Sequence, residues 1–109
     1  MKITSFLASG ILLLSTPLAL AESEHALQAF AHNKAAIEHG LMGHAPILVE
    51  HAQVALQHAD ASQKADANPH MAEAINHIKM AIEHGQMGHA DIATEHAKEA
   101  QKHINMAGR

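Results

Sequence analysis

A seven-residue histidine spacing, mirrored about two short glycine-containing segments, constrains the fold of this chain more than any other feature. The segments are residues 38–45 and 83–90, which read EHGLMGHA and EHGQMGHA. Each holds two glycines three positions apart between helix-favouring runs, which is typical of a helix end, a tight turn and a new helix start. We therefore expect two helical hairpins that bend at these segments.

Histidines recur every seven residues on both sides of each bend. Residues equidistant from the bend of an antiparallel hairpin face each other, so the sequence predicts six facing pairs that use all 12 histidines of the chain. The pairs are His39 with His44, His32 with His51, His25 with His58, His84 with His89, His77 with His96, and His70 with His103.

The composition between the bends predicts four helices. We expect them over 22 to about 39, where Gly40 ends the run, from near His44 to near Asp60, over about 70 to 84, and over about 89 to 106. Pro46 is tolerated in a first helical turn, and Asn68-Pro69 disfavours helix at Asn68. The domain organisation is then a first hairpin at 22–60, a linker at 61–69 and a second hairpin at 70–109 that repeats the first at an offset of 45.

Apolar periodicity fixes the fold class. With histidine as heptad position g, the a and d positions that follow are mainly small or apolar. The e positions add Phe30, Ile37, Val49, Leu56, Ile75 and Ile82. A stripe of this width favours an all-α, up-and-down antiparallel four-helix bundle made of two repeated hairpins, with the e sides packed together and the histidines outward. Thr94 and Gln101 are polar at e, so we expect the last helix to be the least tightly covered.

The amino-terminal segment has the pattern of a secretory signal peptide over residues 1–21. Lys2 precedes an apolar run from Phe6 to Leu20, and small residues lead to Glu22. The run is interrupted at Ser15, Thr16 and Pro17 and is short for a spanning helix of ~20 residues. We expect cleavage after Ala21, a periplasmic location, and no membrane association after cleavage.

Charge and cysteine usage exclude several function classes. Removal of residues 1–21 would take away one lysine and change the net charge from −4 to −5, which argues against nucleic-acid binding and favours a cationic partner. The chain has no cysteine, so thiolate metal sites are excluded. Motifs for covalent haem and zinc proteases are missing, and Glu-x-x-His occurs only from Glu22 to His25, so we do not expect an enzyme.

We call the six histidines that follow one edge of a hairpin a histidine ladder. This ladder predicts metal sites that join two helices. Successive histidines on one helix lie ~10.5 Å apart, too far to share one ion, whereas facing pairs across an Ala-lined seam can bind one each. Imidazole with carboxylate and water suits Cu(II), Ni(II) and Zn(II), and the affinity order puts Cu(II) first. We expect up to six separate sites, several ions per chain, and a monomer with no predicted protein partner.

Other ligand-capable side chains stand near the histidines. Carboxylates could complete a coordination sphere or orient a ring; they are Glu38, Glu50, Glu83 and Glu95, each directly before a histidine, and Glu73 and Glu99, one turn before one. Met42 and Met87 offer soft sulfur for Cu(I), although packing within the turn is the simpler expectation for both.

Two other classes of function remain open. One or two histidines in such positions would more often be solvated helix flanks than ligands, but twelve in register, with no Lys or Glu at g, favour metal. The alternatives are a pH-responsive helical binding protein whose histidines charge together, and a non-covalent haem-binding bundle that uses His and Met.

The pattern resembles the periplasmic small metal-binding protein family, whose members are histidine-rich, Ala-rich helical proteins. The resemblance covers essentially residues 22–109 and is clearest in the segments AIEHGQMGH and ATEHAKEA between His77 and His103. It implies a four-helix bundle, binding of several divalent ions with copper prominent, and a role in metal buffering or tolerance. Members of the family often carry an acidic residue where this chain has Met42 and Met87.

Overall fold

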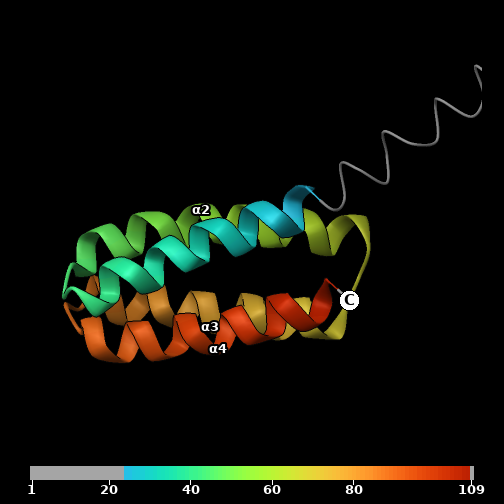
Figure 1. Ribbon diagram of the computed structural model, residues 1–109. Coiled ribbons are helices and arrows are strands. Elements are labelled where there is room, and N and C mark those ends of the chain that lie inside the picture. Colours follow the sequence, from blue (N-terminus) through green and yellow to red (C-terminus); the bar gives the residue numbers. More distant parts are fainter. Residues whose placement is uncertain (1–23, 109) are drawn as a thin grey trace, which may run out of the picture.

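The computed structural model describes residues 24–108, which form an all-α four-helix bundle. The first helix, described over 24–41, is followed by α2 (Ala45–Ala65), α3 (Pro69–Gln86) and α4 (Ala90–Ala107). The first helix and α2 form one hairpin, α3 and α4 form the other, and the two bends lie at the same end of the bundle (Figure 1). The signal peptide expected over 1–21 lies outside the described residues. Within the described part, no helix is both long and apolar enough to cross a membrane.

Both bends have the same backbone hydrogen bonds. The amide of His44 donates to the carbonyl of His39 at 2.9 Å, and that of Gly43 donates to Gly40 at 3.0 Å. Gly43 has φ of 77°, and its counterpart Gly88 has 80°. This pair of bonds closed by a left-handed glycine is the Schellman motif, which satisfies the last carbonyls of one helix immediately before the next begins. The two predicted hairpin bends are therefore confirmed.

The expectation that Gly40 ends the first helix is wrong, because the helix continues to residue 41 and Gly43 provides the left-handed residue. Gly40 and its repeat partner Gly85 are instead buried points of close helix approach. A Cβ atom added at Gly40 would overlap Thr94 Oγ1 on α4, and one added at Gly85 would lie 2.5 Å from Val49 Cγ2 on α2. Each hairpin thus contributes one glycine that lets a helix of the other hairpin approach.

The connection between the hairpins is shorter than the sequence suggested. The expectation that the second helix ends near Asp60 is wrong, because Ala, Gln and Lys support helix and α2 runs to Ala65. α2 ends where the backbone becomes extended at Asp66, with φ −149° and ψ 99°. Pro69 disfavours helix at Asn68, which is extended at φ −140° and ψ 129°. Its side-chain oxygen accepts from the amide of His70 at 2.8 Å, so Asn68 is the N-cap of α3.

The core consists of the predicted a and d positions, and most of its residues are alanine. Fully buried examples include Ala29 and Ala36 in the first helix, and Leu48, Ile78 and Ala97 in the other three. Small side chains at these positions let the helix backbones approach closely. The e positions lie beside this core, and Val49, Leu56 and Ile82 are partly buried against it.

The contact between the first helix and α4 is more polar than the repeat-related contact between α3 and α2. Asn33, at an a position of the first helix, is fully buried, and its Nδ2 donates to Ala97 O at 2.8 Å and Gln101 Oε1 at 2.7 Å. Thr94 is only 3% exposed and donates to the carbonyl of Ala90, so α4 is better covered here than its polar e positions suggested. The equivalent position of the second hairpin, 45 residues later on α3, holds Ile78. A single polar residue at an a position can specify helix register, and Asn33 has the placement for that role.

Phe30 is the one Phe, Tyr or Trp residue in the expected mature chain, and it is not in the core. It is 37% exposed and lines a shallow groove between the first helix and α4, together with Ile37 and Lys102. The interior of the described bundle is therefore packed without Phe30.

Candidate metal centres

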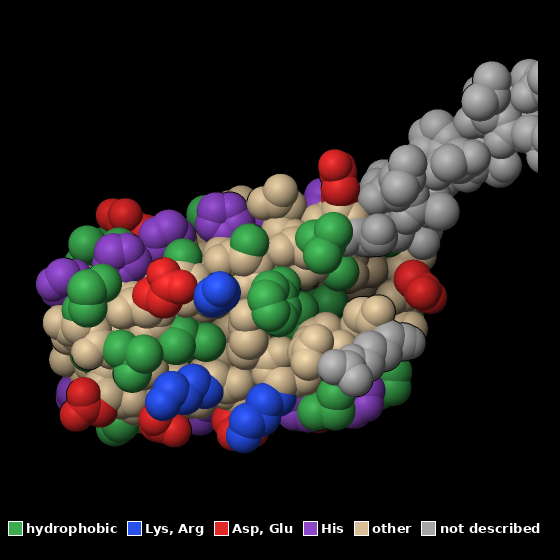
Figure 2. All heavy atoms as spheres, in the orientation of Figure 1, with side chains coloured by type: hydrophobic (Ala, Val, Ile, Leu, Met, Phe, Trp, Pro, Cys, Tyr) green, Lys and Arg blue, Asp and Glu red, His purple; other side chains and the backbone are tan. Residues whose placement is uncertain are grey.

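The 12 histidines lie on two opposite outer edges of the bundle. The first helix carries His25, His32 and His39, α2 with its N-cap carries His44, His51 and His58, α3 carries His70, His77 and His84, and α4 with its N-cap carries His89, His96 and His103. Figure 2 shows histidine side chains along the edge of the first hairpin and others at the opposite edge. The apolar sides of the hairpins pack together between these edges, as the heptad pattern predicted.

All six predicted facing pairs are present as neighbouring rings. Ring centroids are separated by 5.3 Å for His25 and His58, 5.9 Å for His32 and His51, 5.9 Å for His39 and His44, 5.5 Å for His70 and His103, 5.5 Å for His77 and His96, and 6.0 Å for His84 and His89. Each pair joins two helices of one hairpin, which is the arrangement that the mirrored spacing predicted.

Rings of successive facing pairs are also close to one another along each edge. The helices are staggered, so His51 lies 5.9 Å from His32 and 5.4 Å from His39. In the second hairpin, His96 lies 5.5 Å from both His77 and His84. The ~10.5 Å rise along one helix is bridged by a ring of the facing helix, and each hairpin therefore carries a continuous zigzag of six imidazoles.

In three of the pairs the ring nitrogens already converge. Among the described residues, Nδ1 atoms approach to 3.0 Å in His25 and His58, 3.2 Å in His77 and His96, and 3.3 Å in His70 and His103. Two nitrogens bound to one ion at ~2.0–2.1 Å, with an angle between ~90° and ~110°, lie ~2.8–3.4 Å apart. The measured spacing therefore fits two adjacent ligands of a tetrahedral or tetragonal ion.

The last histidine of the first helix and that of α3 each have one unpaired, buried ring nitrogen. The Nδ1 atoms of His39 and His84 are buried and have no hydrogen-bond partner. Buried polar atoms are normally paired, so two such atoms at repeat-related positions require an explanation. An ion bound with His44 or His89 would provide the missing partner in each hairpin.

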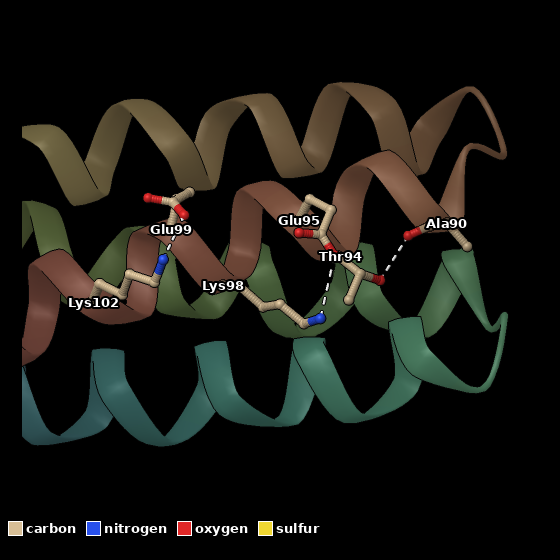
Figure 3. Close-up of polar contacts among 6 residues, drawn as sticks. All are labelled: Ala90, Thr94, Glu95, Lys98, Glu99 and Lys102. Carbon is tan, nitrogen blue, oxygen red and sulfur yellow. Dashed lines mark hydrogen bonds and ion pairs between the residues drawn. The ribbon is translucent and has the colours of Figure 1, made fainter.

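The carboxylates do not complete these pairs in the observed side-chain positions. Within residues 24–108, no three His, Asp or Glu side chains converge as a metal site. Glu95 and Glu99 instead accept from Lys98 at 3.2 Å and Lys102 at 2.8 Å (Figure 3). Each facing pair therefore presents two imidazoles without a converging carboxylate in the observed side-chain positions.

Met42 and Met87 do not pack within the turns. Each side chain is 58% exposed at its bend, so the packing expected from the sequence is wrong. Turn geometry explains this result, because the Schellman closure is made by backbone groups and glycine and needs no apolar cover. Both thioethers are accessible beside the last histidines of the first helix and α3.

Two inner histidines have lowered pKa values. Desolvation, followed by repulsion from His25 and His32, holds the pKa of His58 below its ordinary 6.5. The pKa of His96 is lowered by desolvation first and then by His77 and His84, while Glu99 opposes the shift. A lowered pKa favours the neutral imidazole, which is the form that binds a metal ion.

An alanine-rich bundle with two zigzags of converging imidazoles defines a histidine-rich metal-binding protein. The sequence agrees, because residues 1–107 match the family model described as small metal-binding protein. The chain belongs to this family. None of the curated proteins is significantly similar to it.

Proposed function

We propose that this protein is exported and sequesters or buffers several divalent transition-metal ions at its facing histidine pairs. Metal binding is what the family description states. The observation that carries the finer proposal is the approach of Nδ1 atoms to 3.0–3.3 Å in three pairs, which matches the spacing of two imidazoles on one ion. The remaining three pairs have the same helical positions and similar ring separations.

Copper(II) is the ion we expect to bind most tightly. Imidazole ligands with open positions for water suit Cu(II), Ni(II) and Zn(II), and the affinity of such sites rises toward copper. Nitrogens at this spacing are adjacent ligands, whereas a linear two-coordinate Cu(I) ion would hold them ~4 Å apart at the same bond length. The pairs are therefore better suited to Cu(II) than to two-coordinate Cu(I).

The repetition of similar sites supports binding capacity rather than catalysis. A catalytic metal ion is usually held by three protein ligands with one open position. The histidine pairs instead recur as similar sites along both edges of the bundle. We infer that the protein holds ions for storage, tolerance or transfer without converting a substrate.

Metal titration tests this function. Residues 22–109 would be titrated separately with Cu(II), Ni(II) and Zn(II), with bound ions counted by native mass spectrometry. We expect more than one Cu(II) per chain, nitrogen-dominated coordination in its electron paramagnetic resonance spectrum, and weaker binding of the other two ions. Saturation at one equivalent would contradict the proposal.

Export is a separate part of the proposal and has its own test. It is supported by the charged start, interrupted apolar run and small residues before Glu22. We expect the full-length protein, expressed in a Gram-negative host, to appear in the periplasmic fraction with Glu22 as its first residue. A cytoplasmic product with residues 1–21 still attached would contradict export without affecting the metal proposal.

A further inference from the structure

The two histidine edges differ in the side chains beside the rings. On a helix, residues three or four apart are neighbours, whereas adjacent residues do not face each other. The position three residues after a histidine therefore lies beside the ladder. In the second hairpin these positions hold Glu73, Met80, Ile92, Glu99 and Met106, and in the first they hold Gln28, Ala35, Ile47, Val54 and Ala61. Met42 and Met87 occupy the same position in the two bends, and within the helices only the second edge has carboxylates and thioethers there.

Glu99 has the clearest position among these residues. It follows His96 by three residues and precedes His103 by four on α4, and its side chain leaves α4 on the side of α3 (Figure 3). The pKa of Glu99 is lowered by the hydrogen bond and charge of Lys102 first, and then by His77 and His103. Glu99 also raises the pKa of His96. The carboxylate therefore interacts electrostatically with three rings of the second ladder.

The carboxylate of Glu99 forms an ion pair with the exposed side chain of Lys102. The Nζ atom of Lys102 lies 2.8 Å from Glu99 Oε1, and the two side chains are 65% and 46% exposed. An ion pair that is so exposed contributes little to stability, so a divalent cation can replace the lysine. Rotation of the Glu99 side chain toward the ladder would then bring an oxygen ligand to the ion.

We propose that Glu99 is the third protein ligand of the ion held by His77 and His96, and that this site binds more tightly than its repeat partner at His32 and His51. The inference rests on the proposed function of the histidine pairs. The Nδ1 atoms of His77 and His96 already lie 3.2 Å apart, and the repeat counterpart of Glu99 is Val54, which has no donor atom. Two imidazoles and one carboxylate form a ligand set that Zn(II), Cu(II) and Ni(II) all accept.

Reciprocal substitutions test this assignment. In competition titrations with Zn(II) and a chromophoric chelator, the wild type should show one site that is tighter than the others. Glu99→Val should weaken that site about tenfold or more, since losing even a residue that only orients a ligand weakens binding 10–100-fold. Val54→Glu should create a second tight site in the first hairpin. Lys102→Gln, which copies Gln57, should tighten the Glu99 site.

Glu95→Val is the matched control. Glu95 forms the same type of pair with Lys98, but it directly precedes His96 and is 73% exposed, so its loss removes one charge and no ligand. Affinity unchanged in Glu99→Val, or lowered equally in Glu95→Val, would overturn the assignment. The ion count separates the two hypotheses: several ions of equal affinity would refute only the role of Glu99, whereas a single ion per wild-type chain would refute the histidine-pair function as well.

Discussion

The Nδ1 atoms of His77 and His96 lie 3.2 Å apart across the seam between α3 and α4. At this distance one ring can donate a hydrogen to the other, so the metal-free pair is held together without like-charge repulsion. An ion can take the place of that hydrogen if both rings carry their remaining hydrogen on Nε2. Under the proposed function, little ordering of these two side chains would be needed when an ion binds.

Gly40 allows the first helix to approach α4, and this contact should be sensitive to a single methyl group. The added Cβ of Gly40→Ala would overlap Thr94 Oγ1 and lie 2.7 Å from Leu48 Cδ1. Overpacking a core costs ~1–3 kcal/mol, and improved helix propensity returns up to ~1 kcal/mol. We expect a net loss in the free energy of unfolding, measured by urea denaturation.

The control for Gly40→Ala is Gly108→Ala, because a Cβ at Gly108 would lie no closer than 3.7 Å to Ile104 O. Adding Thr94→Ala to Gly40→Ala should recover part of the loss, since it removes the overlapping hydroxyl. A Gly40→Ala variant as stable as the wild type would show that the helices can separate without cost.

Asn33 should stabilise the bundle through its two hydrogen bonds to α4. Asn33→Ala removes bonds to Ala97 O and Gln101 Oε1, and each is worth ~0.5–1.5 kcal/mol. The buried Oδ1 of Asn33 has no partner and offsets part of this gain, so we expect the free energy of unfolding to fall by ~1 kcal/mol in urea denaturation. Asn76→Ala on the exposed surface of α3 is the control and should change it little. Equal effects of the two substitutions would argue against a specific role for the buried amide.

Acid should destabilise the metal-free protein. The pKa values of His58 and His96 lie below 6.5 in the folded state, so the unfolded chain binds protons first. The free energy of unfolding is therefore highest above pH 6.5 and falls as pH decreases through the lowered folded-state values. His25 and His32 face His58, while His77, His84 and Glu99 surround His96. The lowered pKa of Glu99 acts only below about 4.5 and is a separate effect.

Urea midpoints of metal-free protein between pH 7.5 and 5 would measure this dependence. The His58→Gln, His96→Gln variant should show a smaller change, because glutamine does not titrate. Stability that is constant, or that increases toward pH 5, would contradict the direction of the pKa shifts.

The fold was predictable because histidine period, alanine pattern and bends all indicate the same hairpins. Counting from the bends identified every facing pair, and the heptad assignment identified the buried a and d positions. Phe30 was misassigned because an e position can lie inside the core or at its exposed margin, and periodicity does not distinguish the two. The role of Gly40 was missed for a similar reason: its neighbour Thr94 is distant in sequence.

The site was predictable at the level of residues but less so at the level of atoms. Seven-residue spacing identifies His32 as the facing partner of His51. The ring centroid of His39 also lies 5.4 Å from that of His51, and this contact depends on the axial offset between the two helices, which the spacing does not specify. Helical spacing could have distinguished the two glutamates as candidate ligands. Glu99 lies three residues after His96 and beside the ladder, whereas Glu95 directly precedes His96 and points elsewhere. Convergence of Nδ1 atoms depends on ring rotamers, which the sequence does not specify.

Counting ions in histidine double variants tests the central claim most directly. If each facing pair holds one ion, His77→Ala, His96→Ala and the variant with both changes should all lose the same single Cu(II), as counted by native mass spectrometry. The His77→Ala, His84→Ala variant should lose two, because these residues belong to different pairs. Helix content would be checked in every variant. Loss of two ions in the His77→Ala, His96→Ala variant, with the single variants losing one each, would contradict facing pairs and assign the ions to the diagonal neighbours.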